Sequence, residues 1–390
     1  MRLSNAKNMD KMLETSPGRR AAVGLSGGVD SAMAAAFLLK KGFEVFGATM
    51  LVDDRSQEKI VDKARQVARY LGIEHHVFDF REAFARRVID NFVTAYWQGE
   101  TPNPCIQCNC ELKFGLFLHM ARAIGADCMA TGHYVRRAEQ PETGRFYLRR
   151  GRDLSKDQSY VLYGLNQEQL RSALFPLGDY TKEEVRDEAR KCGVWDVVDR
   201  EESQDICFAD QDYASFLIRT TGRAPLPGNF VDKTGAVLGR HRGLIYYTLG
   251  QRKGLGIALG KPLFVLSLDP ERNEVVLGDH EDTLTRELWA DRLNWTYLAE
   301  SGPEEGFPAQ AKIRYQAPPA PARIYPVSNH KVRVVFDRPQ RAVTPGQAVV
   351  FYNGDIQLGG GRIVSDWRGI RSDLCPNADR RPGNRNAQHF

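Results

Sequence analysis

The chain has 390 residues and a mass of 43.9 kDa, which is enough for two or three domains with sizeable apolar cores. Its 54 basic and 49 acidic residues give a net charge of +5, and 42% hydrophobic with 26% charged residues exclude a disordered chain, a collagen and a coiled coil. The positive excess lies at the two ends, because residues 21–361 carry 43 basic and 44 acidic residues. A nucleic-acid site would therefore have to come from local clusters of charge.

The chain shows no signal for a membrane or for export. No apolar run approaches the roughly 18 residues that a membrane helix needs. Residues 1–14 lack the apolar core of a secretion signal, and the seven cysteines follow no disulfide-framework spacing. We therefore expect a cytoplasmic protein with no membrane partner.

The first 130 residues alternate between strand-like and helical patterns. Strands are predicted at 21–25, 44–50, 75–80 and 128–130, and helices at 32–41, 57–71, 82–97 and 111–124. This alternation predicts an α/β domain with a parallel sheet, whose ligands bind at the carboxyl ends of the strands. Thr181 and Glu184 have the spacing of a capping box, which predicts a helix from there to about Cys192.

After about residue 210 the pattern changes to short β-type runs separated by Gly, Pro and Asp. Strands are predicted at 243–249, 263–268, 275–277, 311–313, 322–326, 331–336, 348–352 and 359–364. The last third is therefore expected to be a small all-β barrel or sandwich.

The most informative motif is Ser26-Gly27-Gly28-Val29-Asp30-Ser31, between the first strand and the first helix. Two glycines allow a sharp turn that presents backbone N–H groups, and the helix N-terminus adds a positive partial charge. The motif predicts an anion cradle that lacks the lysine of a Walker A loop, and it resembles the ATP loop of the PP-loop pyrophosphatases. The alternative is a plain turn in which Ser26 or Asp30 caps the helix.

Three cysteines, Cys105, Cys108 and Cys110, lie within six residues, just before the helix predicted from Glu111. A thiol at a helix N-terminus is favoured as thiolate, which is its reactive form. The spacing is also compatible with zinc, with a redox pair or with inert buried thiols, but a second pair of zinc ligands is absent. Cys207 is the distant candidate partner. Together with the anion cradle, these thiols favour ATP-driven activation followed by sulfur transfer.

Two basic segments are candidates for RNA binding. Residues 233–261 contain six basic residues, no acidic residue and two tyrosines, and residues 136–156 contain seven basic and three acidic residues. Such runs are usually solvated surface, but acid-free stretches with aromatic residues suit a phosphate backbone with stacked bases.

Taken in order, the motifs resemble those of the bacterial tRNA-specific 2-thiouridylases, which belong to the PP-loop superfamily. The similarity extends over roughly residues 20–367. Its motifs are SGGVDS, TPNP with Cys108-Asn109, Ala130–Tyr134, Lys156–Tyr160, Ile206–Phe208, Tyr247–Gly256, Arg314-Tyr315 and Thr344–Ala348. The resemblance implies a PP-loop ATP-binding domain at 18–212, a central tRNA-binding domain at 213–283 and a C-terminal β-barrel at 284–367. The tails at 1–17 and 368–390 are expected to be disordered.

The resemblance also implies ATP-dependent 2-thiolation of a wobble uridine in tRNA, with Mg²⁺ and with a cysteine desulfurase or sulfur carrier as donor. Cys207 would carry the persulfide, and Cys108 would form a disulfide with it when sulfur is released. The residues implied for ATP are Gly24, Leu25, Ser26, Gly27, Gly28, Val29, Asp30, Ser31, Met50 and Gly132. Those implied for the target base are Asn103, Pro104 and Cys105, and those implied for tRNA are His133, Lys156, Asp157, Gln158, Arg314, Tyr315 and Gln347.

One departure leaves a second chemistry open. Many members of the family have Asp where this chain has Cys105, so that Cys105, Cys108 and Cys207 could instead be ligands of a [4Fe-4S] cluster. Two further functions compete with thiolation: an amide-forming PP-loop ligase, which would not need Cys108 and Cys207, and a non-catalytic RNA-binding module. The sulfur donor, the tRNA isoacceptors, the oligomeric state and the roles of Cys105 and Cys110 are not predicted.

Overall fold

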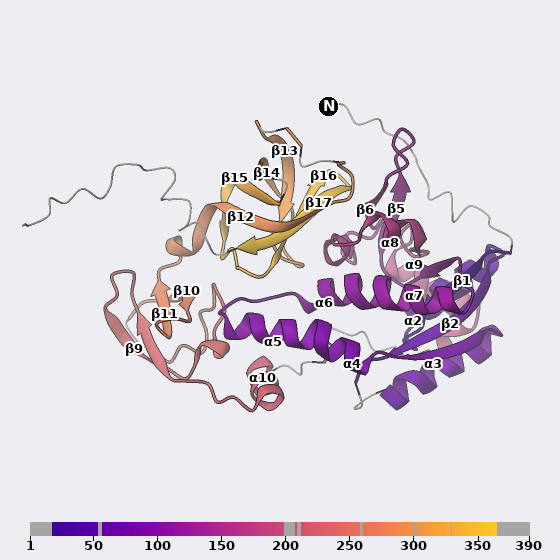
Figure 1. Cartoon of the computed structure of the whole chain (residues 1–390), viewed down its shortest axis with the longest axis horizontal. Helices are drawn as coiled ribbons and strands as arrows, with labels where there is room; N and C mark the ends of the chain where they lie inside the picture. The colour runs from indigo at the N-terminus through magenta and orange to yellow at the C-terminus, as the bar shows by residue number, and fades with distance from the viewer. Residues whose placement is uncertain are drawn as a thin grey trace, which may run out of the picture.

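The structure is a computed structural model. It describes residues 18–53, 57–198, 207–208, 212–257, 260–299, 302–303, 305–328 and 330–364. In Figure 1 an α/β domain lies at one end, a small β domain at the other, and a barrel between them. The tails expected to be disordered lie outside the described residues.

The α/β domain is built on a five-stranded sheet with the order β3-β2-β1-β4-β7, in which all pairings are parallel. The strands are β1 (Arg20–Gly24), β2 (Glu44–Leu51), β3 (Glu74–Asp79), β4 (Cys128–Ala130) and β7 (Ala173–Leu174). The predicted parallel sheet is therefore confirmed. Its carboxyl edge gathers the residues that follow Gly24, Met50 and Ala130.

Both faces of this sheet are buried. Ala21 and Val23 of β1 belong to one apolar cluster, whereas Ala22 between them belongs to another, as the alternation of a strand requires. Helices of the first cluster are α2 (Val29–Lys40), α3 (Gln57–Leu71) and α9 (Lys182–Lys191). The capping box predicted at Thr181 and Glu184 is present and opens α9.

A continuous helical rod covers the other face. It consists of α6 (Pro104–Gln107), a π-helix η2 (Cys108–Phe117) and α7 (Leu118–Ala123). A second rod of α4 (Arg81–Phe84), a π-helix η1 (Ala85–Ile89) and α5 (Asp90–Trp97) runs toward the central domain, as Figure 1 shows. Helix α8 (Gln167–Ser172) and the 3-10 helices η3 (Ser159–Leu162) and η4 (Val194–Asp196) complete the domain.

The first rod begins earlier than predicted. The sequence placed its start near Glu111, but Asn103 caps it by accepting a hydrogen bond from the Cys105 N–H at 3.1 Å, and Pro104 occupies its first turn. Asparagine followed by proline is a helix-start signal that was present in the sequence. Cys108 and Cys110 therefore lie inside the helix rather than before it.

The central domain begins with α10 (Tyr213–Thr221) and continues as a four-stranded sheet of order β10-β11-β8-β9. Its strands are β8 (Gly228–Val231), β9 (Val237–His241), β10 (Phe264–Asp269) and β11 (Glu274–Gly278). The strand predicted at 243–249 is wrong, because those residues include a 3-10 helix, η5 (Leu244–Tyr246). A further 3-10 helix, η6 (Glu281–Thr283), leads into the barrel.

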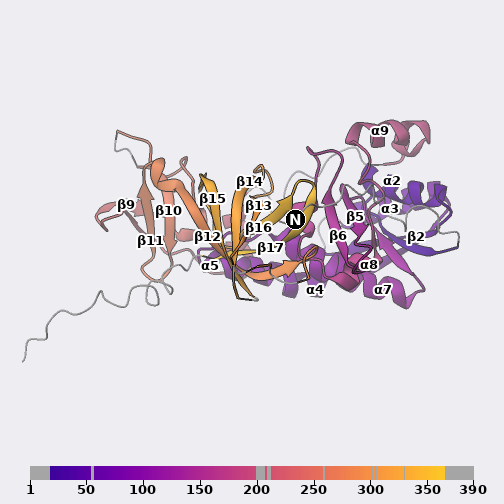
Figure 2. The ribbon, with the colours of Figure 1, turned by 90° about the horizontal axis from the view of Figure 1, so that it is seen from above.

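The C-terminal barrel has six strands and closes through pairing of β12 with β17. Its strands are β12 (Leu284–Trp295), β13 (Phe307–Lys312), β14 (Ala320–Ser328), β15 (Lys331–Arg341), β16 (Ala348–Asn353) and β17 (Ile356–Val364). A hairpin of the α/β domain, β5 (Val135–Glu139) and β6 (Phe146–Arg150), pairs with β17 and extends the same sheet. In Figure 2 this hairpin lies between the barrel and the rest of the α/β domain. The barrel prediction is confirmed, and the barrel is tied to the α/β domain by backbone pairing.

Candidate active site

The loop that follows β1 is shaped as an anion cradle. Gly27 has a φ of +78°, which a glycine adopts without strain, and α2 begins after Gly28 without a side-chain cap. The Ser26 N–H donates to Ser31 Oγ at 3.2 Å, and Ser31 Oγ donates to the Gly28 carbonyl at 3.0 Å. The serines therefore brace the turn, and the first N–H groups of α2 remain for an anion.

Gly132, predicted to bind ATP from a distant part of the sequence, lies against this loop. A Cβ on Gly132 would lie 2.7 Å from the Asp30 carbonyl carbon and 2.9 Å from the Ser31 nitrogen. Only glycine fits such a close backbone approach without a shift of the loop. Met50, near the end of β2, pairs with Phe78 of β3 at the same edge of the sheet.

The loop also has a buried cation that the sequence analysis missed. Both carboxylate oxygens of Asp30 accept hydrogen bonds from Lys182 Nζ, at 2.7 and 2.8 Å, and Asp30 Oδ1 accepts another from the Tyr134 hydroxyl at 2.8 Å. The Lys182 side chain is only 9% exposed. The sequence did contain a hint of this contact. The capping box places Lys182 in the first turn of a helix, where the helix dipole disfavours a cation, so that a lysine there is expected to have an acidic partner. The cation that pairs with Asp30 of the loop thus comes from α9.

The candidate relay thiols lie close together. Burial raises the pKa of Cys207 to about 11, and the neighbouring Cys108 and Cys105 thiols raise it further. Asp53, just beyond β2, also acts on Cys207, which places this thiol near the carboxyl edge of the sheet. Cys207 reaches solvent, whereas Cys108 is half-buried. The described cysteines are all free thiols, so the disulfide implied between Cys108 and Cys207 is not formed in this structure.

The expectation that the helix dipole favours the thiolates is wrong, since burial dominates. Burial raises the pKa of both Cys105 and Cys108 above the ordinary thiol value. The charge that opposes this rise is Lys113, which acts on Cys105, Cys108 and Cys207 alike. Lys113 is half-buried in η2, five residues after Cys108. Because a π-helix closes each turn between residues i and i+5, its winding brings Lys113 to the face of Cys108.

Cys110 packs into a different apolar cluster from Cys108. A Cβ on Gly164 would lie 2.6 Å from Cys110 Sγ, and the cluster that packs around Cys110 is not the one that packs around Cys108. Burial raises the pKa of Cys110 to about 12. Cys110 is therefore a packing residue of the rod.

The described residues do not form an iron–sulfur ligand set. Within the part of the chain that the structure describes, no group of three His, Cys, Asp or Glu side chains is arranged to hold a metal ion. Cys105, Cys108 and Cys207 are near neighbours, but they are not arranged as ligands of a metal ion. The structure therefore does not support the hypothesis of a [4Fe-4S] cluster.

Two of the three predicted target-base residues border a cavity of about 270 Å³, whose lining does not include Cys105. Asn103 and Pro104 line it from the rod and Gln347 from the barrel. Gln347 Nε2 donates to the Thr101 carbonyl at 2.7 Å, and the Thr101 N–H donates to the Pro345 carbonyl at 3.0 Å. The barrel loop thereby fixes the segment that carries Asn103.

Several residues predicted to contact tRNA have internal partners. His133 is buried with its ring on Thr131 Oγ1 at 2.7 Å, and burial lowers its pKa well below the usual value. Gln158 accepts from the Tyr134 N–H, and Arg314 donates to the Ala342 carbonyl. Lys156 is half-buried, whereas the Tyr315 ring is 40% exposed. Of this group, Tyr315 presents the largest surface to a ligand.

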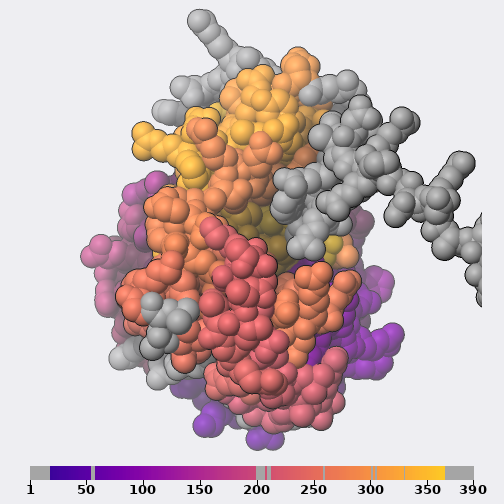
Figure 3. Space-filling view, turned by 90° about the vertical axis from the view of Figure 1, so that its left-hand side faces the viewer, coloured from indigo at the N-terminus to yellow at the C-terminus, as the bar shows by residue number. Residues whose placement is uncertain are grey.

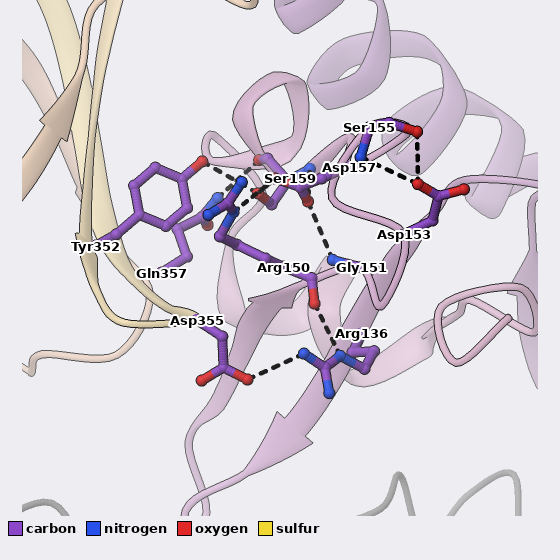
Figure 4. Close-up of polar contacts among 10 residues, drawn as sticks. All are labelled: Arg136, Arg150, Gly151, Asp153, Ser155, Asp157, Ser159, Tyr352, Asp355 and Gln357. Atoms are coloured by element: carbon purple, nitrogen blue, oxygen red, sulfur yellow. Dashed lines mark hydrogen bonds and ion pairs between the residues drawn. The ribbon is translucent and has the colours of Figure 1, made fainter. Parts of the chain in front are cut away.

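Figure 4 shows that Asp157, Arg136 and Arg150 of segment 136–156 have partners within the fold. Asp157 is buried and accepts from Arg150, from the Gly151 N–H and from Ser159. Arg136 pairs with Asp355 at 3.0 Å. Four of the six arginines of this segment form ion pairs, and those of Arg136 and Arg149 with Asp355 join the hairpin to the barrel.

The segment 233–261 keeps part of its charge. Lys233 pairs with Asp282 at 2.6 Å and Lys261 with Asp279 at 3.0 Å, whereas Arg252 and Lys253 are exposed in a turn. Figure 3, which faces the central domain, shows the surface hollowed between this domain and the barrel.

A parallel sheet with a glycine-rich loop between β1 and α2, and without a Walker A lysine in that loop, fits the PP-loop class of α/β proteins, and the match to a HUP domain model places the chain in it. Three family models match the chain in succession: the tRNA methyl transferase HUP domain at 19–211, the tRNA methyl transferase PRC-barrel domain at 214–279 and the aminomethyltransferase beta-barrel domain at 285–363. The chain belongs to the family of tRNA-specific 2-thiouridylases, which are tRNA sulfurtransferases.

The relatives match along nearly their whole length. The tRNA-specific 2-thiouridylase MnmA of Desulfitobacterium hafniense is 48% identical over 366 residues, which cover 89% of this chain and 98% of the relative. Those of Carboxydothermus hydrogenoformans and Moorella thermoacetica are each 50% identical, over 358 and 355 residues; both matches cover 88% of this chain, and they cover 97% and 99% of the relatives. No helix among the described residues is long and apolar enough to cross a membrane.

Proposed function

We propose that this protein replaces the 2-oxygen of a tRNA wobble uridine with sulfur, converting ATP to AMP and pyrophosphate. The observation that carries the proposal is the meeting of Cys207 with Cys108 at the sheet edge that also bears the anion cradle. A reaction that activates an oxygen with ATP and displaces it with sulfur needs both parts within reach of one substrate atom.

The cradle supports ATP as the activating substrate. The uncapped start of α2 and the close contact of Gly132 suit a polyphosphate chain, which backbone N–H groups can bind without a bulky side chain. Lys182 neutralises Asp30, so the carboxylate of the loop does not repel the phosphates. Because Lys182 occupies both oxygens of Asp30, the phosphates themselves would provide most of the oxygen ligands for Mg²⁺. The ion would neutralise phosphate charge.

The chemistry proceeds in three balanced steps. The uracil O2 attacks the α-phosphorus of ATP, and pyrophosphate leaves. The terminal sulfur of a Cys207 persulfide then attacks C2, and AMP departs with the former O2. Finally the Cys108 thiolate attacks the Cys207 sulfur, which releases the thiocarbonyl and leaves a Cys108–Cys207 disulfide, and a dithiol reductant must supply two electrons to reset it. Lys113 favours the anionic sulfur in the last two steps.

The target uridine would be turned out of the anticodon loop to reach these groups, because its C2 is shielded in a stacked loop. The cavity beside Asn103 and Pro104 suits a flipped base, and Cys105 borders the relay. Tyr315 offers an exposed ring for stacking, and we assign tRNA contact also to Lys156, Gln158 and the turn at Arg252 and Lys253. His133, Asp157, Arg314 and Gln347 would act on tRNA by holding these surfaces in place.

The sulfur on Cys207 would come from a cysteine desulfurase or a sulfur-carrier protein. The Cys207 side chain is exposed, as a thiol that must meet another protein has to be. A cytoplasmic location would keep these thiols reduced between turnovers.

The test incubates the protein with ATP, Mg²⁺, a persulfide donor and unmodified tRNA, and detects 2-thiouridine by mass spectrometry. Cys108→Ser and Cys207→Ser should abolish the product, while Cys110→Ser, the matched control from the same rod, should retain most of it. Formation of AMP without thionucleoside would point to an amide-forming ligase instead, and full thiolation by both serine variants would refute the thiol relay.

A further inference from the structure

Phe208, the residue directly after Cys207, is inserted into a cluster of aromatic side chains. Its ring centroid lies 5.4 Å from that of Phe84, 5.3 Å from Phe92 and 5.2 Å from Phe216. Phe208 is 9% exposed, whereas Cys207 beside it is exposed. The Phe208 ring is thus packed in the interior, while the adjacent Cys207 still reaches solvent.

This aromatic socket is made by three separate parts of the chain. Phe84 belongs to α4 and Phe92 to α5, while Phe216 belongs to α10 at the start of the central domain. The same cluster contains Leu112 from the rod and Ile245 from η5. Edge-to-face ring pairs at these distances add specific geometry to the burial of apolar area.

Cys108 packs against the same socket. Cys108 is one of the partly buried side chains that pack against this cluster, as is Leu116, eight residues further along the rod. One relay thiol therefore contacts the socket directly, and the other is attached to it through the adjacent Phe208. The socket thus contacts both segments that carry the relay thiols.

We propose that Phe208 is a positioning residue for sulfur transfer, and that its insertion into this socket holds Cys207 within reach of Cys108. The inference rests on the proposed function, because it assigns Cys207 as the sulfur-carrying thiol. Consecutive Cα atoms are about 3.8 Å apart, so an anchored Phe208 ring restricts Cys207 to a small volume. Without the anchor the thiol samples a larger volume, and its effective concentration at Cys108 falls.

The socket lies between the α/β domain, which contributes α4 and α5, and the central domain, which contributes α10 and η5. α10 and η5 lie in the region matched by the PRC-barrel domain model, where the basic turn at Arg252 and Lys253 is also found. The anchor therefore depends on correct docking of the central domain against α5. Displacement of that domain would move Phe216 and Ile245 away from Phe208 and release Cys207.

The experiment measures the rate at which Cys108 and Cys207 form a disulfide in the full chain treated with diamide. The two thiols lose two protons and two electrons, and the N=N bond of diamide becomes a hydrazine. The product is quantified as the cross-linked peptide by mass spectrometry. Phe208→Ala should slow it at least tenfold, and Phe208→Leu should restore much of the rate. Phe307→Ala on barrel strand β13 is the matched control and should leave it unchanged.

Two further readouts separate positioning from misfolding and from failure of the proposed function. ATP-to-AMP turnover should persist in Phe208→Ala, while single-turnover thiolation by the persulfide-loaded variant should fall in parallel with cross-linking. Phe84→Leu removes an aromatic ring from the socket and leaves Phe208 itself unchanged. It should also slow cross-linking, so the proposal is tested even if Phe208→Ala does not fold.

An unchanged cross-linking rate in either variant, or a wild-type chain that forms no Cys108–Cys207 cross-link, would overturn the proposal. Cross-linking needs neither ATP nor tRNA. A wild-type chain that cross-links but makes no thiouridine would therefore refute the proposed function and leave the anchoring role standing.

Discussion

Replacing Lys182 with methionine removes the cation that neutralises Asp30 beside the ATP loop. The two side chains are 9% and 34% exposed, and Nζ lies 2.7 Å from the carboxylate. Loss of one partner of a fully buried pair costs about 3–5 kcal/mol. Because Asp30 reaches solvent and keeps its bond from Tyr134, we expect about 2 kcal/mol here. For a domain of this size that corresponds to a fall in Tm of about 4–8 °C.

The same substitution should weaken ATP binding, because the uncompensated carboxylate then faces the phosphates. We expect the KM for ATP to rise at least tenfold, which corresponds to about 1.4 kcal/mol. Thermal unfolding and ATP turnover of Lys182→Met, Asp30→Asn and the double variant form a double-mutant cycle. Adding Asp30→Asn to Lys182→Met should recover part of the lost stability. A Lys182→Met variant with wild-type Tm and wild-type KM for ATP would refute the reasoning.

The remaining predictions concern the thiols, the loop contact and tRNA binding. The raised pKa of Cys207 keeps its thiol protonated near neutrality, so the rate of its alkylation should rise about tenfold per pH unit between pH 7 and 9. Lys113→Met should raise that pKa further and slow alkylation at each pH. Faster alkylation of Lys113→Met would show that Lys113 does not lower the pKa of Cys207. Gly132→Ala should raise the KM for ATP and lower Tm, because its Cβ would clash with the loop backbone; unchanged values would place the loop elsewhere. Charge reversal at Arg252 and Lys253 should weaken tRNA binding in filter-binding assays and make it less dependent on salt; an affinity that does not change with salt would contradict this surface.

The regular α/β part of the chain was predictable because its signals are local. β1 is a short apolar run, the loop after it is glycine-rich, and α2 contains alanine and leucine with few competing residues. The capping box that opens α9 was likewise predictable from two residues, Thr181 and Glu184. Hydrophobic periodicity and helix-capping residues are features of residues close together in the sequence, so no long-range contact is needed to detect them.

The features that prediction missed depend on distant partners. β12 carries Arg286, Glu287 and Asp291 and looks like a loop, but Glu287 pairs with Arg333 on β15 and Asp291 pairs with Arg362 on β17. Barrel closure supplies those partners, and the sequence alone does not reveal them.

The candidate site shows the same limit. The cysteines and the loop were recognisable as motifs, but the contact of Lys182 with Asp30 joins residues 152 positions apart. The sign of the thiol pKa shifts also depended on burial, which comes from packing of the rod against the rest of the fold. Chemistry-bearing residues could be named from sequence, whereas their electrostatic environment could not.

In the reaction that we propose, the sulfur incorporated into tRNA passes through Cys207. The most direct test of this route loads Cys207 with a ³⁴S persulfide, removes free donor, and adds ATP with unmodified tRNA for a single turnover. We expect up to one labelled 2-thiouridine and one AMP per loaded chain, together with a Cys108–Cys207 disulfide. Thiouridine without the label, or labelled product from a Cys207→Ser chain treated in the same way, would contradict it.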